Sequence, residues 1–193
     1  KKSTAPVAET DERIQATVKT MLARIDADGE SAVREYAAQF DNWQGDFILS
    51  DEKRAELIAQ VPEQVKQDIQ FAYQQVRTFA EAQRNSITEF SIESAPGVTL
   101  GQKVIPVQCA GCYVPGGRYS HAASALMSIA TAKVAGVETI VACSPPKDGS
   151  IHPAIVYAMD LAGADIILEM GGVHAVATMA RGLFTGVSAD ILV

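Results

Sequence analysis

The first ninety residues place apolar and polar positions with the period of an α-helix. Apolar residues recur three or four positions apart over 11–27, which predicts an amphipathic helix. Further helices are predicted over 31–40, over 51–60 with Ser50 as its cap, and from Pro62 onward. The apolar stripe of this last, long helix is expected to pack in the core; it consists of Val65, Ile69, Ala72, Val76, Phe79 and Ala80.

After residue 86 the pattern changes to the alternation that is typical of strands. The segments 87–92 and 98–106 flank Ala95-Pro96-Gly97, so they predict a hairpin or two neighbouring strands. From residue 107 short apolar runs alternate with helical stretches. The predicted strands are 108–114, 139–143, 166–169 and 191–193, and the predicted helices are 122–135, 153–162 and 173–181.

This alternation of strands and helices predicts a parallel sheet with right-handed crossovers. We therefore expect an α/β fold. A mainly helical segment with a β hairpin, residues 1–106, precedes a Rossmann-like nucleotide-binding domain over 107–193. The last strand ends at Val193, where a ligand-binding loop of such a sheet is expected to begin. We therefore expect the domain to be incomplete at this edge, and the chain to be the N-terminal part of a larger protein.

Composition and charge narrow the class of protein. The 193 residues are 48% hydrophobic and carry a formal net charge of −7, which disfavours nucleic acid and anionic membranes as partners. No stretch reaches the ~20 apolar residues that span a bilayer, and Lys1-Lys2 leads into a polar segment unlike a signal peptide. Three cysteines form no closed disulfide framework. We expect a cytoplasmic protein that acts on a small molecule.

A glycine-containing turn carries the clearest chemical signal. The segment 111–120 reads Gly-Cys-Tyr-Val-Pro-Gly-Gly-Arg-Tyr-Ser and lies between an apolar run and a helical pattern. At such a turn backbone N–H groups converge, and glycine lets a phosphate approach the backbone. The spacing is not G-x-G-x-x-G, so the turn alone favours an ordinary strand-to-helix connection.

Together with four later motifs, this turn resembles the histidinol dehydrogenase family. The motifs lie at 111–117, 125–127, 132–137, 143–146 and 171–177, in the order and spacing of the family. The resemblance implies an aldehyde-dehydrogenase-like parallel sheet, and NAD as acceptor in two successive oxidations, from alcohol to aldehyde to acid. It also implies zinc and an intertwined homodimer. The Glu-His pair and the zinc ligands are implied beyond Val193, so we expect no catalytic or metal-binding residue in this chain and no turnover by it alone.

The resemblance also suggests which residues meet the cofactor. It implies that Tyr113 contacts NAD and that Pro115, Gly116 and Gly117 shape the loop. The alternative for Tyr113 is an aromatic residue packed beside the turn. His174 stands where the family usually has a glutamine that meets the cofactor. The alternative for His174 is a solvated side chain in the first turn of a helix.

Arg118 and His121 depart from the small or apolar residues usual in family members that act on histidinol. A guanidinium suits a carboxylate, sulfonate or phosphate. This pattern resembles the branch that oxidises hydroxylated sulfonates such as 2,3-dihydroxypropane-1-sulfonate, with L-histidinol as the other candidate. Alternatively, Arg118 pairs with a surface carboxylate or with the pyrophosphate of the cofactor.

Two other classes of function remain open at this stage. One is a non-catalytic nucleotide-binding or interaction module. The other is a redox protein that uses Cys109-Ala110-Gly111-Cys112, which can also be half of a zinc site. On a strand these two cysteines would point to opposite faces. We therefore favour buried cysteines that pack as small apolar residues.

Overall fold

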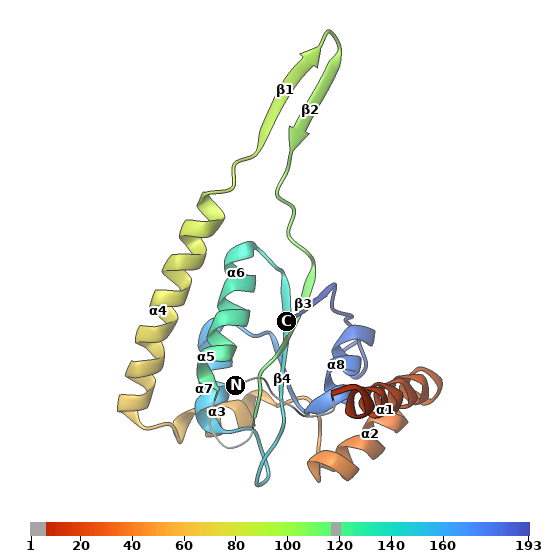
Figure 1. Cartoon of the computed structure of the whole chain (residues 1–193). Helices are drawn as coiled ribbons and strands as arrows, with labels where there is room; N and C mark the ends of the chain where they lie inside the picture. Colours follow the sequence, from red (N-terminus) through yellow and green to blue (C-terminus); the bar gives the residue numbers. More distant parts are fainter. Residues whose placement is uncertain (1–6, 117–120) are drawn as a thin grey trace.

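The computed structural model describes residues 7–116 and 121–193 (Figure 1). The first part is helical and ends in a hairpin: α1 Val7–Asp28, α2 Glu30–Tyr36, the π-helical turn η1 Ala37–Asp41, α3 Asp51–Ala59, α4 Glu63–Asn85, β1 Phe90–Ala95 and β2 Val98–Gln102. The second part alternates strands and helices: β3 Cys109–Tyr113, α5 Ala122–Ala125, the π-helical turn η2 Leu126–Ala130, α6 Thr131–Ala135, β4 Thr139–Ser144, α7 Pro153–Ala162, β5 Ile166–Glu169, α8 Gly172–Arg181 and β6 Ile191–Leu192.

The four strands of the second part form one parallel sheet. Their order is β5-β4-β3-β6, and each neighbouring pair is parallel. This confirms the α/β fold predicted from the apolar runs. A short segment of the helical part adds to the β5 edge, because Leu49 N–H donates to Ile167 O at 2.9 Å and Glu169 N–H donates to Phe47 O at 2.8 Å. The segment 47–49 thereby covers backbone groups that would otherwise be open to solvent.

Helices cover both faces of the sheet (Figure 1). On one face α4, α5, α6 and α7 pack around a core that includes Cys112, Ile129 and Met159. On the other face α1, α2 and α8 enclose a second core that includes Cys109 and Leu168. None of the helices within residues 7–116 and 121–193 has both the length and the apolar character needed to cross a membrane.

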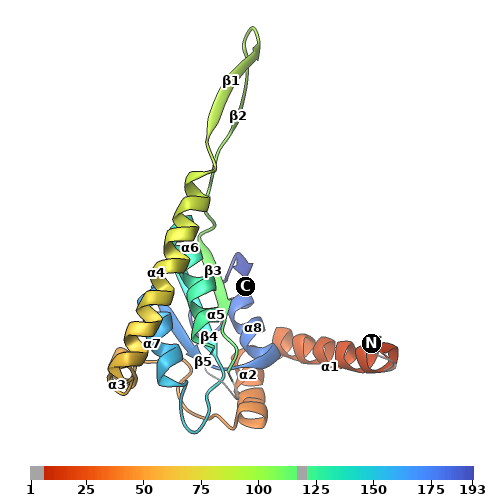
Figure 2. The same cartoon turned by 60° about the vertical axis from the view of Figure 1, so that its left-hand side comes forward.

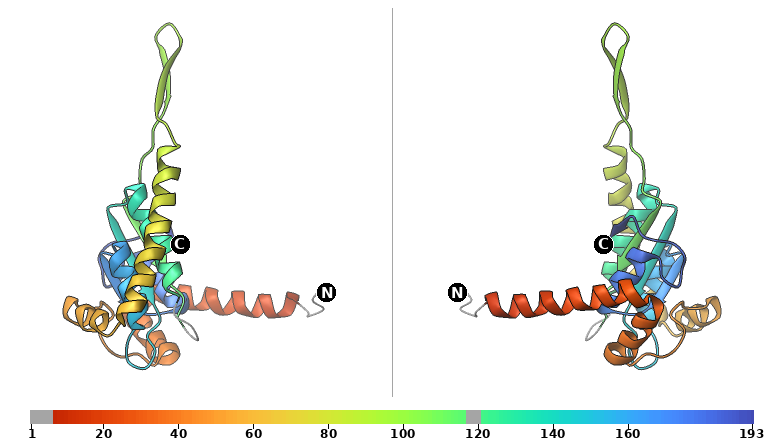
Figure 3. Two further views of the ribbon diagram at one scale, coloured as in Figure 1. Left: turned by 90° about the vertical axis from the view of Figure 1, so that its left-hand side faces the viewer. Right: turned by 90° about the vertical axis from the view of Figure 1, so that its right-hand side faces the viewer.

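The hairpin and the start of α1 extend away from this body. Strands β1 and β2 form a separate antiparallel pair beyond the end of α4, and every residue of both strands is exposed (Figure 2). Their turn uses Gly97 in the left-handed region, with φ 78°. The N-terminal half of α1 projects from the sheet domain (Figure 3), so Ile14 is exposed whereas Met21 and Ile25 are buried. The hairpin thus lies outside the parallel sheet, as expected.

Several local predictions need correction. Phe79 is 67% exposed and does not belong to the buried stripe of α4. Pro62 is the cap residue and the helix begins one residue later, at Glu63. The predicted helix over 122–135 is interrupted by η2, and the one over 31–40 ends in η1. Ser50 does cap α3, because its side chain accepts a hydrogen bond of 3.2 Å from Lys53 N–H.

Candidate functional site

Three loops meet where strands β3, β4 and β5 end. They bring together Gly116, Pro145 and Gly171. A Cβ atom on Gly116 would lie 2.6 Å from Pro145 Cγ, and one on Gly171 would lie 2.6 Å from Pro145 Cβ. Both distances are below the closest approach of real Cβ contacts, so each glycine is required for the loops to pack this closely.

The hydroxyl of Tyr113 joins the end of β3 to the beginning of α8. Tyr113 is the last residue of β3 and is half-buried. Its hydroxyl oxygen accepts a hydrogen bond of 3.2 Å from Gly172 N–H. The structure therefore places this predicted cofactor residue beside the beginning of the helix that carries His174.

His174 is buried and paired with a carboxylate. Only 1% of the residue is exposed, and its Nε2 lies 2.9 Å from Asp41 Oδ2. The same oxygen accepts a hydrogen bond of 3.0 Å from Gly171 N–H. The alternative of a solvated histidine is therefore wrong, because the ring is shielded from water and stacks against Phe40 with ring centres 6.5 Å apart. The contact of His174 with NAD stays a prediction.

Asp41 is a site residue that the sequence pattern did not indicate. It ends the π-helical turn η1, and Asn42 follows in the left-handed conformation with φ 51°. Such turns occur frequently at functional sites. The only signal in the sequence is an Asp-Asn pair after an apolar stripe, which more often marks a helix end.

The beginning of α8 offers hydrogen-bond donors to a ligand. Gly171 precedes the helix in an extended conformation and has no side chain to cap it, while the hydroxyl of Tyr113 accepts the N–H of Gly172, the first residue of the helix. The first-turn N–H groups of a helix lack partners within the helix and carry the positive end of its dipole. Nδ1 of His174 is buried without a hydrogen-bond partner. The N–H groups at such a helix start suit the phosphates of a cofactor such as NAD, while Nδ1 of His174 is open to another group of that cofactor.

A second buried carboxylate braces the loop after β4. Glu169, the last residue of β5, is 1% exposed. Its Oε2 lies 3.0 Å from Lys53 Nζ, and its Oε1 accepts hydrogen bonds from Ser150 Oγ at 2.5 Å and Ile151 N–H at 3.3 Å. The ammonium group of Lys53 also lies 4.9 Å from the ring centre of Trp43. This network holds the β4 loop against β5 and α3, and sequence reasoning did not predict it.

The structure shows no hydrogen bond between the remaining predicted site residues that it describes and the beginning of α8. Pro115 is exposed beside Gly116. His121 is exposed at the beginning of α5, where it makes no capping hydrogen bond through its side chain. Gly117 and Arg118 lie outside the described residues, so the substrate contact predicted for Arg118 stays a prediction.

The cysteines are arranged for packing. Cys109 and Cys112 belong to the cores on opposite faces of the sheet, as expected for a strand, and all three cysteines are free and buried. Burial raises the pKa of the Cys109, Cys112 and Cys143 thiols, which disfavours thiolate chemistry. Over residues 7–116 and 121–193 no three His, Cys, Asp or Glu side chains lie close enough to hold a metal ion. These residues therefore do not fit a zinc site of their own.

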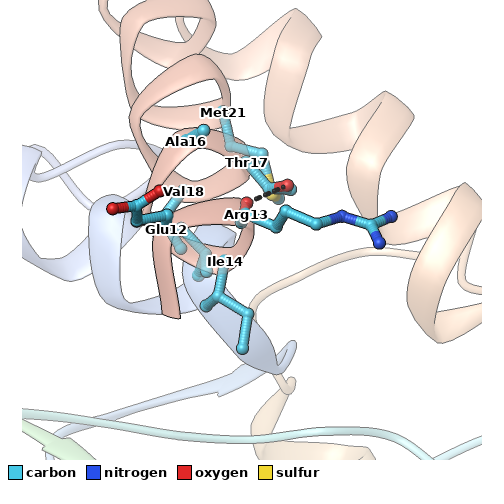
Figure 4. Close-up of a pocket in the computed structure, with 8 residues that line it drawn as sticks. Glu12, Arg13, Ile14, Ala16, Thr17, Val18 and Met21 are labelled. Atoms are coloured by element: carbon cyan, nitrogen blue, oxygen red, sulfur yellow. Dashed lines mark hydrogen bonds between the residues drawn. The ribbon is translucent and has the colours of Figure 1, made fainter. Parts of the chain in front are cut away.

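A hollow of about 880 Å³ lies elsewhere, along the exposed half of α1 (Figure 4). Its wall on the other side includes Val173 in the first turn of α8. Of the predicted site residues that the structure describes, none lines it; the lining residues described are Glu12, Arg13, Ile14, Ala16, Thr17, Val18, Met21 and Val173.

Comparison with known proteins agrees with the fold and the motifs. The sequence profile of histidinol dehydrogenase matches residues 5–193. A histidinol dehydrogenase homolog of Ruegeria pomeroyi is 56% identical over 177 residues, and sulfopropanediol 3-dehydrogenase of the same organism is 54% identical over 181. These alignments cover 91% and 93% of the chain but only 41% and 42% of the relatives.

More distant relatives indicate the same family. Histidinol dehydrogenase of Methanosarcina barkeri is 39% identical over 184 residues, which cover 94% of the chain and 42% of that protein. The crystal structure of histidinol dehydrogenase from Elizabethkingia anophelis superposes with a TM-score of 0.85 at 30% identity, covering 93% of this chain and 41% of that one. The chain spans about two fifths of the length of these proteins. Its fold, its motifs and the profile match over nearly all of its residues show that it belongs to the histidinol dehydrogenase family.

Proposed function

We propose that this chain forms the nucleotide-binding part of an NAD-dependent dehydrogenase that oxidises an amino alcohol or a hydroxylated small acid. The observation that carries this proposal is the meeting of Tyr113, Gly116 and His174 around the beginning of α8. In open parallel sheets, ligands bind at the carboxyl ends of the strands, where these residues lie.

NAD supplies the acceptor of a hydride when it is bound. This chain would contribute binding and orientation. The N–H groups of the first turn of α8 suit the pyrophosphate. Gly116 and Gly171 let two loops pack closely against Pro145 beside the helix, while the hydroxyl of Tyr113 and the ring of His174 fix the beginning of the helix.

The substrate that we propose first is an anionic diol of the 2,3-dihydroxypropane-1-sulfonate type, with L-histidinol as the other candidate. The relative named sulfopropanediol 3-dehydrogenase is 54% identical, whereas the Methanosarcina histidinol dehydrogenase is 39% identical. Arg118 would supply positive charge toward the anionic group, and His121 would supply a hydrogen-bond donor. The same proposal places the acid-base pair and the zinc ligands outside these residues, and the full-length protein in the cytoplasm as a homodimer.

The test uses the protein at the full length of its reading frame. NADH formation is followed with 2,3-dihydroxypropane-1-sulfonate and with L-histidinol. In Arg118→Ala the KM for the sulfonate should rise about tenfold to hundredfold, because one charge-assisted contact is lost, while the KM for NAD stays unchanged. Arg118→Lys should recover only part of the loss, since lysine lacks the guanidinium fork.

Arg84→Ala is the matched control, because it removes a half-buried guanidinium in the last turn of α4, outside the proposed site. An unchanged KM for the sulfonate with weaker NAD binding would assign Arg118 to the pyrophosphate and return histidinol as the leading substrate. NAD binding without NADH formation from either compound would favour a non-catalytic nucleotide-binding module.

A further inference from the structure

The carboxylate of Asp41 makes two contacts at the carboxyl end of β5. Its Oδ2 lies 2.9 Å from His174 Nε2 and accepts the N–H of Gly171 at 3.0 Å. The side chains of Asp41 and His174 are 11% and 2% exposed. Both polar groups are thus largely removed from water and take their partners from the protein. One carboxylate from the helical part therefore holds both the loop before α8 and a ring in its first turn.

The second ring nitrogen of His174 is left open. Nδ1 is buried and has no hydrogen-bond partner. It lies beside the first residue of α8, since a Cβ atom on Gly172 would be 3.8 Å from it. A carboxylate only accepts hydrogen bonds, so Nε2 carries the proton in its contact with Asp41. With Nε2 as the donor, the tautomer of a neutral ring has its lone pair on Nδ1, at the beginning of the helix.

We infer that Asp41 is a positioning residue of the nucleotide site. It fixes the tautomer of His174, so that Nδ1 accepts a hydrogen bond from the bound dinucleotide. The group that meets Nδ1 is then a donor, such as a ribose hydroxyl or an amide N–H, because a phosphate oxygen has no proton to give. This inference rests on the proposed function, since it takes a dinucleotide as the ligand. An open buried acceptor is costly unless a ligand satisfies it.

The first experiment reads the tautomer directly, in the protein at the full length of its reading frame. Side-chain ¹H–¹⁵N correlation spectra identify the His174 ring by the signals that disappear in His174→Gln. Without NAD, Nε2 should be protonated and Nδ1 unprotonated. Addition of NAD should shift the Nδ1 resonance, because that nitrogen gains a donor. A protonated Nδ1 in the wild-type protein overturns the inference, whatever the activity of the enzyme.

The second experiment separates positioning from folding. In Asp41→Ala the tautomer preference should be lost, and the KM for NAD should rise about tenfold, with a smaller change in kcat. Asp41→Asn should recover most of this, because one amide oxygen can accept both hydrogen bonds. Asp26→Ala is the matched control, since Asp26 binds Arg181 at the far end of α8. It should leave the tautomer and the KM for NAD unchanged.

The outcomes distinguish the two proposals. An equal rise of the KM for NAD in Asp26→Ala and Asp41→Ala would reduce Asp41 to an anchor of α8 and overturn the inference. An unchanged KM in Asp41→Ala, with NADH still formed, would do the same while leaving the proposed function intact. If the wild-type protein neither binds NAD nor forms NADH, the proposed function fails and so does the ligand assigned to Nδ1.

Discussion

The packing of two loops against Pro145 in a third loop gives a sharp test of the site. Gly116 is not in the left-handed region, so Gly116→Ala brings no backbone strain of that kind. The change acts by contact, because the new methyl group would lie 2.6 Å from Pro145 Cγ and 3.1 Å from Pro145 Cδ. Ordinary van der Waals contacts of a Cβ atom begin at 3.4 Å. Since a proline ring cannot rotate away, the loop itself must shift.

The expected cost follows from the size of the overlap. Overpacking of a tight contact costs about 1–3 kcal/mol of the free energy of unfolding. For a chain of this size the melting temperature should then fall by roughly 2–12 °C. NAD binding should weaken together with the stability, because the shifted loop is the one that would face the cofactor.

A double-mutant cycle assigns the cost to the proline ring. Pro145→Ala removes Cγ and Cδ, which are the ring atoms that a methyl group on Gly116 would meet. When Pro145 is already alanine, Gly116→Ala should therefore lower the free energy of unfolding by at least about 0.5 kcal/mol less than it does in the wild type. Residues in contact show coupling energies of about 0.5–3 kcal/mol. Gly171→Ala is the matched comparison: its methyl group would lie 2.6 Å from Pro145 Cβ, which alanine keeps. Its cost should persist in the Pro145→Ala background.

Urea and thermal unfolding of the three single and two double variants, with the wild type, provide the measurement. Two results would refute the reasoning. One is a Gly116→Ala variant as stable as the wild type. The other is a Pro145→Ala background that relieves Gly116→Ala and Gly171→Ala to the same extent, since the structure places different atoms of Pro145 against the two glycines.

Two further predictions concern buried groups. Burial raises the pKa of the Cys109 and Cys112 thiols, so the unfolded chain loses these protons at a lower pH than the folded chain does. The free energy of unfolding should therefore fall as the pH rises above about 8.5. Slow alkylation of both thiols by iodoacetamide in the native protein, and fast alkylation in urea, would check their burial. Lys53→Met leaves the buried carboxylate of Glu169 without its cation and should lower the free energy of unfolding by about 1–3 kcal/mol. This figure is smaller than that for a fully buried pair, because Lys53 is partly exposed. Glu169→Gln in the same chain should restore part of that stability in urea titrations. If Lys53→Met lowers the free energy of unfolding equally with Glu169 and with Gln at position 169, the pairing is contradicted.

The parallel sheet could be predicted because its signals are local. Buried strands require short apolar runs, and β4 and β5 lie within one residue of their predicted bounds. The cap at Ser50 is also local, since the hydroxyl and its N–H partner are three residues apart. Phe79 was predicted wrongly because helical periodicity identifies an apolar stripe without saying how much of it another helix covers.

The burial of His174 could not be predicted in this way. Its partner Asp41 is 133 residues away in the chain, and it reaches the site only because a π-helical turn follows α2. A histidine in the first turn of a helix is typical of a solvated position, so nothing nearby in the sequence indicates a buried pair. The edge segment 47–49 was missed for a related reason, because three residues are too few for a strand pattern.

These long-range contacts share one feature: the helical part supplies them to the sheet at the proposed site. Asp41 binds the loop before α8, Phe47 pairs with the end of β5, and Lys53 neutralises the last residue of that strand. All three positions fall within 13 residues of the sequence. The carboxyl end of the sheet is therefore completed by a segment that precedes it by more than fifty residues. Substitutions in the segment 41–53 should then affect the proposed nucleotide site as directly as substitutions in its own loops.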